Sequence, residues 1–233
     1  MALNAGSSAL ADLPLIRGSA LRSSARHAQV APGTEVNHQL IPVLPGLAGV
    51  LGEPGLRAGA SYLIESSLSL ALALMAQVSR EGAWAAAIGL PDLGAQAAAG
   101  LGIDLDRLAL IPEPGHAWLE VLSTVADAVD VVAIRPPHRP ADQAVRRIAA
   151  RMRQRGSTLL VLGEHWPGAF MRLSVTDSVW SGMRPDGHGH LAARHAQVTR
   201  VGKSGTDAQR MWLPAADGSV RPYAEPPTLR VVP

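Results

Sequence analysis

The sequence predicts an α/β protein of three layers, with a mostly parallel sheet between helices and antiparallel C-terminal strands at one edge. Three observations carry this prediction. From residue 61 to residue 163, short apolar segments alternate with helical segments of about 10–15 residues, as in βαβ units. Some of the short segments are apolar throughout, which is typical of strands buried on both faces. After Gly163, strand-like segments follow one another without intervening helices, which favours antiparallel pairing.

The parallel strands are expected where apolar runs are short and bounded by turn residues. They are Ser61–Ile64, Trp84–Gly89, Leu108–Ile111, Val129–Ile134 and Ser157–Gly163. Three antiparallel strands are expected at Leu173–Val179, Leu191–Arg200 and Gln209–Leu213. Residues 39–213 therefore form the predicted core, between a flexible or docking arm at 1–38 and a Pro-rich, exposed tail at 214–233.

Each expected helix has a start or stop signal. Ser66 or Ser67 can cap a helix that runs to Arg80, and Gly102 ends a helix over Leu93–Leu101. Two further helices follow proline-containing breaks, at His116–Ala128 and Ala141–Arg155. The last helix has apolar residues on one face and most of its arginines off that face.

Composition limits the possible functions. Of 233 residues, 47% are hydrophobic and 17% are charged, which excludes wholesale disorder. Cysteine is absent, so disulfides, thiolate catalysis and Cys-ligated zinc are excluded. The most apolar stretch, Leu68–Val78, is shorter than the ~20 residues that span a bilayer. We therefore expect a cytoplasmic protein without a membrane partner.

The order of the elements resembles the RecA recombinase core over roughly residues 45–213. The segments that carry the resemblance are Gly59–Leu72, Arg80–Ile88, Leu101–Leu108, Ala128–Ile134 and Gly156–Leu162. Leu101–Leu108, with the sequence LGIDLDRL, is the most specific of them. The resemblance implies a three-layer RecA-like sandwich.

The nucleotide chemistry of that family is missing. A P-loop takes a Gly-rich loop and a Lys to hold phosphates, but the corresponding segment here is Glu65-Ser66-Ser67-Leu68-Ser69. Arg135 stands at the Walker B aspartate position, and Pro91, beside Asp92, stands at the catalytic glutamate position. We interpret the chain as a pseudo-ATPase with no catalytic residues, no nucleotide site and no cofactor.

Two other segments have the look of ligand sites. Gly202-Lys203-Ser204 holds the one lysine of the chain, but Gln197 stands where a P-loop has its first glycine, so we expect a hairpin turn. His188, His190 and His195 suggest a zinc site, but the flanking glycines and the lack of a supporting acidic cluster favour a polar hairpin loop. We expect no bound metal.

Charge is divided unequally between the halves. Residues 1–130 hold 6 basic and 12 acidic groups, a balance of −6, whereas residues 131–233 hold 15 and 7, a balance of +8. Possible DNA contacts in the basic half are Arg135, Arg139, Arg146, Arg147 and Trp166. The alternatives are that Trp166 packs against the sheet edge and that the arginines form a solvated helix face. We expect DNA contact to be weak or indirect.

Among RecA-like proteins, the chain most resembles the compact actinobacterial ImuA-type accessory proteins of SOS mutagenesis. The small core, the degenerate nucleotide segment, the region from Trp180 to Leu191 and the Pro-rich tail carry this resemblance. It implies an adaptor that binds an ImuB-like, Y-family polymerase-related protein and, through it, an error-prone polymerase. The alternatives are a SulA-type inhibitor of cell division and a DNA-dependent ATPase.

The partner surface is expected in the C-terminal third, where edge strands can accept an added strand. Candidate partner-binding residues are Trp180, Met211, Trp212, Pro226 and Pro227. The alternative is that both tryptophans complete the core and the tail has no role.

Overall fold

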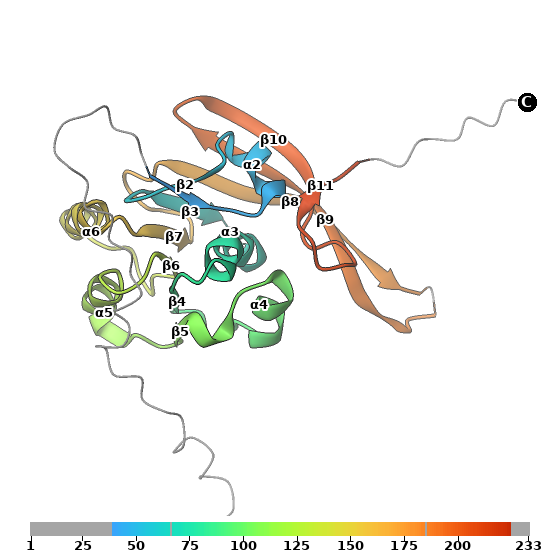
Figure 1. Cartoon of the computed structure of the whole chain (residues 1–233), viewed down its shortest axis with the longest axis horizontal. Helices are drawn as coiled ribbons and strands as arrows, with labels where there is room; N and C mark the ends of the chain where they lie inside the picture. The colour runs from blue at the N-terminus through green and yellow to red at the C-terminus, as the bar shows by residue number, and fades with distance from the viewer. Residues whose placement is uncertain (1–38, 66, 185, 225–233) are drawn as a thin grey trace, which may run out of the picture.

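The computed structural model describes residues 39–65, 67–184 and 186–224, and its centre is one nine-stranded sheet (Figure 1). The strand order is β11-β10-β9-β8-β3-β7-β6-β4-β5. Six neighbouring strands are parallel: β3 Ser61–Glu65, β4 Ala85–Ile88, β5 Leu108–Ile111, β6 Val131–Ile134, β7 Thr158–Leu162 and β8 Met171–Met183. The predicted α/β architecture with a mostly parallel sheet is confirmed.

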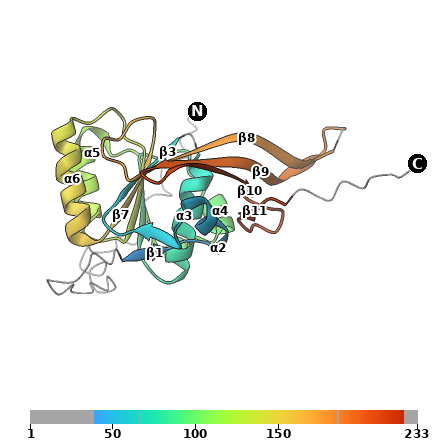
Figure 2. The same cartoon turned by 90° about the horizontal axis from the view of Figure 1, so that it is seen from above.

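Helices cover both faces of the parallel strands (Figure 2). On one face, α3 (Leu68–Arg80) and α4 (Ala95–Leu101) contribute to one buried apolar cluster. On the other face, α5 (Trp118–Val125) and α6 (Asp142–Arg155) contribute to a second cluster. Strands β4 and β6 are buried along their whole length because both of their faces are covered.

The helix ends follow local chemistry. Ser67, one of the two predicted caps, caps α3, and its hydroxyl accepts a hydrogen bond from the Leu70 N–H at 3.2 Å. Gly102 ends α4 with a φ of 98°, which favours glycine. The helix predicted at His116–Ala128 is instead a short 3-10 turn, Gly115–Ala117, followed by α5, and a second 3-10 turn, Leu105–Arg107, precedes β5. None of the helices in the described ranges is long and apolar enough to cross a membrane.

Of the three strands predicted to be antiparallel, Leu173–Val179 lies in β8, which pairs parallel with β3 and antiparallel with β9. The strands after β8 are antiparallel, as predicted for two of them, and extend one edge of the sheet. They are β9 Gly189–Gly202, β10 Gly205–Trp212 and β11 Arg221–Pro222. Strand β8 pairs with β3 from Met171 as far as Ser174, whereas it continues beside β9 as far as Met183. Residues 177–183 and 189–194, which we call the arm, therefore project from the core as two strands (Figures 1 and 2).

The arm is longer than the alternation of side chains predicted. Asp177 has a φ of 48°, and it lies in a bulge where the β8–β9 register shifts between Thr176 and Val179. A second register shift follows between Ser181 and Met183. These irregularities interrupt the two-residue period, which is why the sequence pattern ended the first strand at Val179.

Both ends of the described chain pack beside the extended sheet. Strands β1 (Leu40–Pro42) and β2 (Gly55–Arg57) form a small antiparallel sheet, and α2 (Pro45–Leu51) lies between them in the chain. Residues 214–224 differ from the predicted exposed tail, because Ala215 and Val220 are buried and β11 pairs with β10. Pro222 is compatible with this pairing since β11 is an edge strand. The N-terminal segment at 1–38, predicted to be a flexible or docking arm, lies outside the described residues, as do Pro226 and Pro227.

Candidate functional site

The segment that resembles a P-loop runs directly from strand into helix. Strand β3 ends at Glu65 and α3 begins at Leu68, so only two residues connect them. The Glu65 carboxylate accepts a hydrogen bond from the Arg172 guanidinium of β8 at 2.6 Å. Ser67 is buried and its hydroxyl caps the helix. The side chains of Glu65 and Ser67 are therefore bonded within the protein.

Arg194 of β9 contacts the same segment from the arm side. Its Nη1 donates to the Ser69 hydroxyl at 3.0 Å, and its Nε donates to the Ser178 hydroxyl at 2.7 Å. Its guanidinium also lies 5.7 Å from the centre of the Trp180 ring. Burial lowers the pKa of Arg194 below its usual value, because removal from water disfavours the charged form. The base of the arm is thus fixed to the first turn of α3.

Arg135 and Asp92 form an ion pair at the carboxyl ends of the parallel strands. The Arg135 Nη1 donates to Asp92 at 2.7 Å, which joins the end of β6 to the loop after β4. This bond holds the pKa of the Asp92 carboxyl below its usual value. At the two positions where the resemblance places catalytic carboxylates, the chain therefore has a cation and a proline, and the neighbouring Asp92 is neutralised by that cation.

A cavity of about 450 Å³ lies beside this ion pair. Five prolines line it together with Arg135: Pro91, Pro112, Pro114, Pro136 and Pro137. Gly89 allows the strand ends to approach, because it has a φ of 68° and a Cβ there would lie 2.4 Å from the Arg135 carbonyl oxygen. The mainly apolar lining can accommodate an apolar side chain, and it offers few groups that could hold a phosphate.

The candidate DNA contacts are spread over several elements. Arg139, Arg146 and Arg147 are exposed in or just before α6, whereas Arg135 is engaged with Asp92. Two other arginines of α6, Arg151 and Arg155, bond Asp127 beyond the end of α5. They hold the two helices together, and the bond from Arg151 lowers the pKa of Asp127.

Trp166 lies in the core rather than on a surface. Its side chain is 4% exposed and packs in the cluster under α5 and α6. Its indole Nε1 is buried and has no hydrogen-bond partner among the described residues. In this conformation the ring offers no face to a nucleobase.

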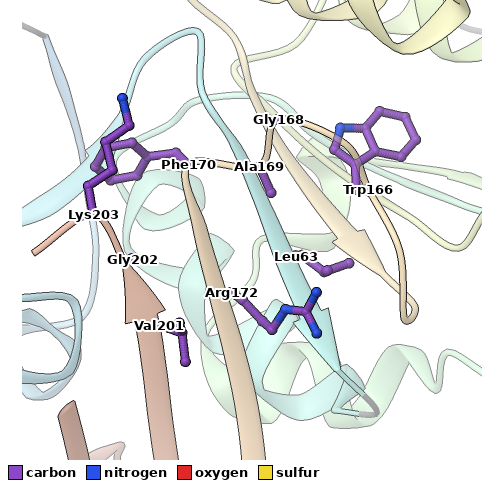
Figure 3. A pocket seen from close by; sticks show the side chains of 9 residues that line it. All are labelled: Leu63, Trp166, Gly168, Ala169, Phe170, Arg172, Val201, Gly202 and Lys203. Atoms are coloured by element: carbon purple, nitrogen blue, oxygen red, sulfur yellow. The ribbon is translucent and has the colours of Figure 1, made fainter. Parts of the chain in front are cut away.

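A corner cavity of about 400 Å³ adjoins Trp166 (Figure 3). Strand residues Leu63, Arg172 and Val201 line it from the sheet, and the loop residues around Ala169 line it from the side. Lys203 also lines it, from the predicted hairpin turn between β9 and β10. The cavity therefore has two cationic side chains in its lining, Lys203 and Arg172, and Arg172 is paired with Glu65.

The candidate partner residues have very different environments. Trp180 is 45% exposed on the arm, whereas Met211 is fully buried. Three further apolar residues of the arm are about half exposed, and the sequence analysis did not single them out: Val179, Met183 and Leu191. The signal was present, since the predicted strands included Val179 and Leu191, but the bulges obscured which side chains the arm exposes.

Trp212 belongs to a cluster of three half-buried rings. It lies 5.6 Å from the His195 ring and 5.1 Å from the Tyr223 ring, and His195 stacks on Tyr223 at 4.7 Å. No three His, Asp or Glu side chains gather as metal ligands anywhere in the described part of the chain.

These rings continue a sheet surface that α5 and α6 do not cover, which we call the open face. The β8–β9–β10 register places its residues in rows: Arg172, Val201 and Thr206; Ser174, Thr199 and Ala208; Thr176, Gln197 and Arg210; and finally Val179, His195 and Trp212. Many of these side chains are exposed and the others are half-buried. Figure 2 shows the strands extending away from α5 and α6.

Comparison with known proteins finds one family model and a curated relative. A family model described as MT3502 N-terminal domain matches residues 49–168. Among curated proteins, the chain is similar to Uncharacterized protein Rv3395c of Mycobacterium tuberculosis (strain ATCC 25618 / H37Rv), with 39% identity over 125 residues. That alignment covers 53% of this chain and 61% of the relative, so the chain spans about three fifths of the length of the curated relative it matches. The family match ends before β8, so the arm and the open face lie beyond it.

Proposed function

The chain belongs to the MT3502 N-terminal domain family, and we propose that it works as a non-catalytic, RecA-like adaptor in SOS-induced translesion DNA synthesis and mutagenesis. The proposed partner is an ImuB-like protein related to Y-family polymerases and, through it, an error-prone polymerase. The adaptor acts in the cytoplasm and joins the nucleoid when engaged.

One observation carries the non-catalytic part of this proposal: internal bonds occupy the degenerate nucleotide segment. Arg172 holds Glu65, Ser67 caps α3, and Arg194 holds Ser69. A bound phosphate would have to replace these bonds, and this segment has neither the glycines nor the lysine that normally make the replacement favourable. The Arg135–Asp92 pair supports the same proposal.

The arm supports the adaptor part of the proposal. Trp180 and Leu191 expose 45% and 55% of their surfaces on a two-stranded extension. Isolated two-stranded hairpins are marginally stable in water, and interface energy concentrates in exposed aromatic anchors of this kind. The arm therefore suits a surface that a partner protein covers.

Damage-induced mutagenesis in cells tests the proposed function. A strain lacking the gene is complemented with the wild-type chain, with the arm variant Trp180→Ala/Leu191→Ala, or with Leu110→Ala as a control. Leu110 is 46% exposed on β5, at the opposite edge of the sheet, so the control removes exposed apolar surface comparable to that of Leu191 alone, away from the arm. We expect the arm variant to lose mutagenesis after ultraviolet irradiation and the control to retain it.

Two outcomes would contradict the proposal. One is undiminished mutagenesis in the strain lacking the gene. The other is a block of cell division when the chain is overproduced in a strain without the polymerase, which would favour the SulA-type alternative.

A further inference from the structure

We propose that Arg194 orients the arm for its partner, and that Ser69 in the first turn of α3 sets partner affinity through this one contact. The inference rests on the proposed function, because it concerns how the same arm binds the same partner. Arg194 is the arm residue of β9 that adjoins the core, and the register places it opposite Trp180 of β8. It acts through Trp180 and the strands of the arm, so it is a positioning residue.

The backbone of Arg194 is fixed to the chain that follows β10. Its N–H donates to the Pro214 carbonyl oxygen at 2.8 Å, and its own carbonyl oxygen accepts from the Leu213 N–H at 2.7 Å. The side chain of Arg194 therefore starts from a backbone that is held from outside the arm. A bond from this side chain can fix the direction in which the arm leaves the core.

The side chain joins three elements. Nη1 donates to the Ser69 hydroxyl of α3 at 3.0 Å, and Nε donates to the Ser178 hydroxyl of β8 at 2.7 Å. The same guanidinium lies 5.7 Å from the centre of the Trp180 ring. Because a guanidinium is planar and donates from fixed positions, the two hydroxyls and the ring must keep one arrangement around it. This arrangement sets the angle between the arm and α3.

Burial makes these bonds important. Arg194 is half-buried, and burial is the cause of its lowered pKa, to which no carboxylate of the described residues contributes. Its side-chain nitrogens donate to two hydroxyls, Ser69 and Ser178. A cation that is partly removed from water loses stability when one of its acceptors is removed. We therefore expect the guanidinium to turn toward water when the Ser69 hydroxyl is absent, and the arm to lose its fixed direction.

A fixed direction matters for binding because the arm is a two-stranded extension, which has little stability of its own. Trp180 is 45% exposed and lies on the guanidinium of Arg194, so that residue also determines where the proposed anchor points. A mobile arm would have to be ordered when the partner binds, and this ordering costs affinity. In this chain the helix turn that follows the degenerate nucleotide segment thus keeps the arm ready for its partner.

The first part of the test measures the arm without any partner. The chain has no cysteine, so nitroxide labels can be attached to the single added cysteines of His190→Cys on the arm and Gln154→Cys on α6, both exposed positions. Double electron–electron resonance then gives the distribution of distances between them. We expect a narrow distribution for the labelled parent chain and broader ones for Ser69→Ala, Arg194→Gln and Arg194→Lys, since lysine lacks the planar fork. Ser69→Thr, which keeps the hydroxyl, should remain narrow.

The second part measures affinity for the ImuB-like protein by calorimetry with unlabelled chains. Ser69→Ala should weaken binding about fivefold, the equivalent of one hydrogen bond, whereas Ser69→Thr should bind as the wild type does. The matched control is Ser123→Ala, which removes a half-buried hydroxyl from α5, and it should bind normally. Thermal melts separate lost orientation from lost folding, and Ser69→Ala carries the test if Arg194→Gln fails to fold.

Distance distributions of Ser69→Ala and Arg194→Gln that equal the parent distribution would overturn the proposal. Broadened distributions combined with undiminished affinity would also overturn it, because orientation would then not control binding. A wild-type chain that fails to bind the ImuB-like protein would contradict the adaptor function instead, and the distance distributions would still decide whether Arg194 orients the arm.

Discussion

Replacing Trp180 with alanine should separate partner binding from stability. The side chain is 45% exposed, so roughly 100 Å² of an indole that buries up to ~250 Å² remains for a partner to cover. At ~25 cal/mol per Å², covering that area contributes about 2.5 kcal/mol, or roughly 60-fold in Kd. Arg194 keeps its bonds to Ser69 and Ser178 in the variant, so the base of the arm stays attached to α3.

Isothermal titration calorimetry against the purified ImuB-like protein measures this difference. We expect Trp180→Ala to bind tens of times more weakly, while its melting midpoint stays close to that of the wild type. Leu110→Ala, on the opposite edge strand, should bind normally. Unchanged affinity of Trp180→Ala would refute the assignment of the arm as the interface, and a large drop in its melting midpoint would mean that Trp180 belongs to the fold.

Three further predictions concern the nucleotide segment, the C-terminus and acid stability. Millimolar ATP should leave the melting midpoint unchanged, whereas a real site at ~100 times its Kd would add about 2.7 kcal/mol and raise the midpoint by roughly 5–10 °C. Deleting residues 225–233 should leave thermal stability unchanged, but deleting 214–233 removes buried Ala215 and Val220 and should lower the free energy of unfolding by roughly 3 kcal/mol in denaturant titrations; equal effects would contradict the packing of β11. The pKa of Asp127 is lowered in the folded state, so its contribution to stability is present above the unfolded value of about 4 and is lost as pH falls through the lower folded value. Asp127→Asn should therefore flatten the acid side of the stability profile between about pH 5 and pH 2, and a profile identical to the wild type would contradict this.

The parallel sheet could be predicted because its signals are local. Val131–Ile134 is apolar throughout, since helices cover both faces of β6, and a continuous apolar run is what such burial leaves in a sequence. Helix α6 likewise shows its buried face through Val145, Ile148 and Met152. These patterns depend only on near neighbours in the chain.

The arm and the contacts of the candidate site could not be predicted from such patterns. The bulge at Asp177 breaks the alternation that defines a strand, and the sequence does not reveal its φ of 48°. Trp118 and Trp180 are the same residue type, yet one is fully buried and the other is 45% exposed. The bond between Arg194 and Ser69 joins residues 125 positions apart, so it depends on the completed sheet order rather than on any motif.

Hydrogen–deuterium exchange of the chain with and without the ImuB-like protein tests the central claim most directly, because it shows where a partner binds. We expect the amides of residues 177–183 and 189–193 to exchange more slowly in the complex, without any need for nucleotide. Slower exchange confined to other parts of the chain, or none unless ATP is added, would contradict the account of this protein as a nucleotide-independent adaptor that binds through its arm.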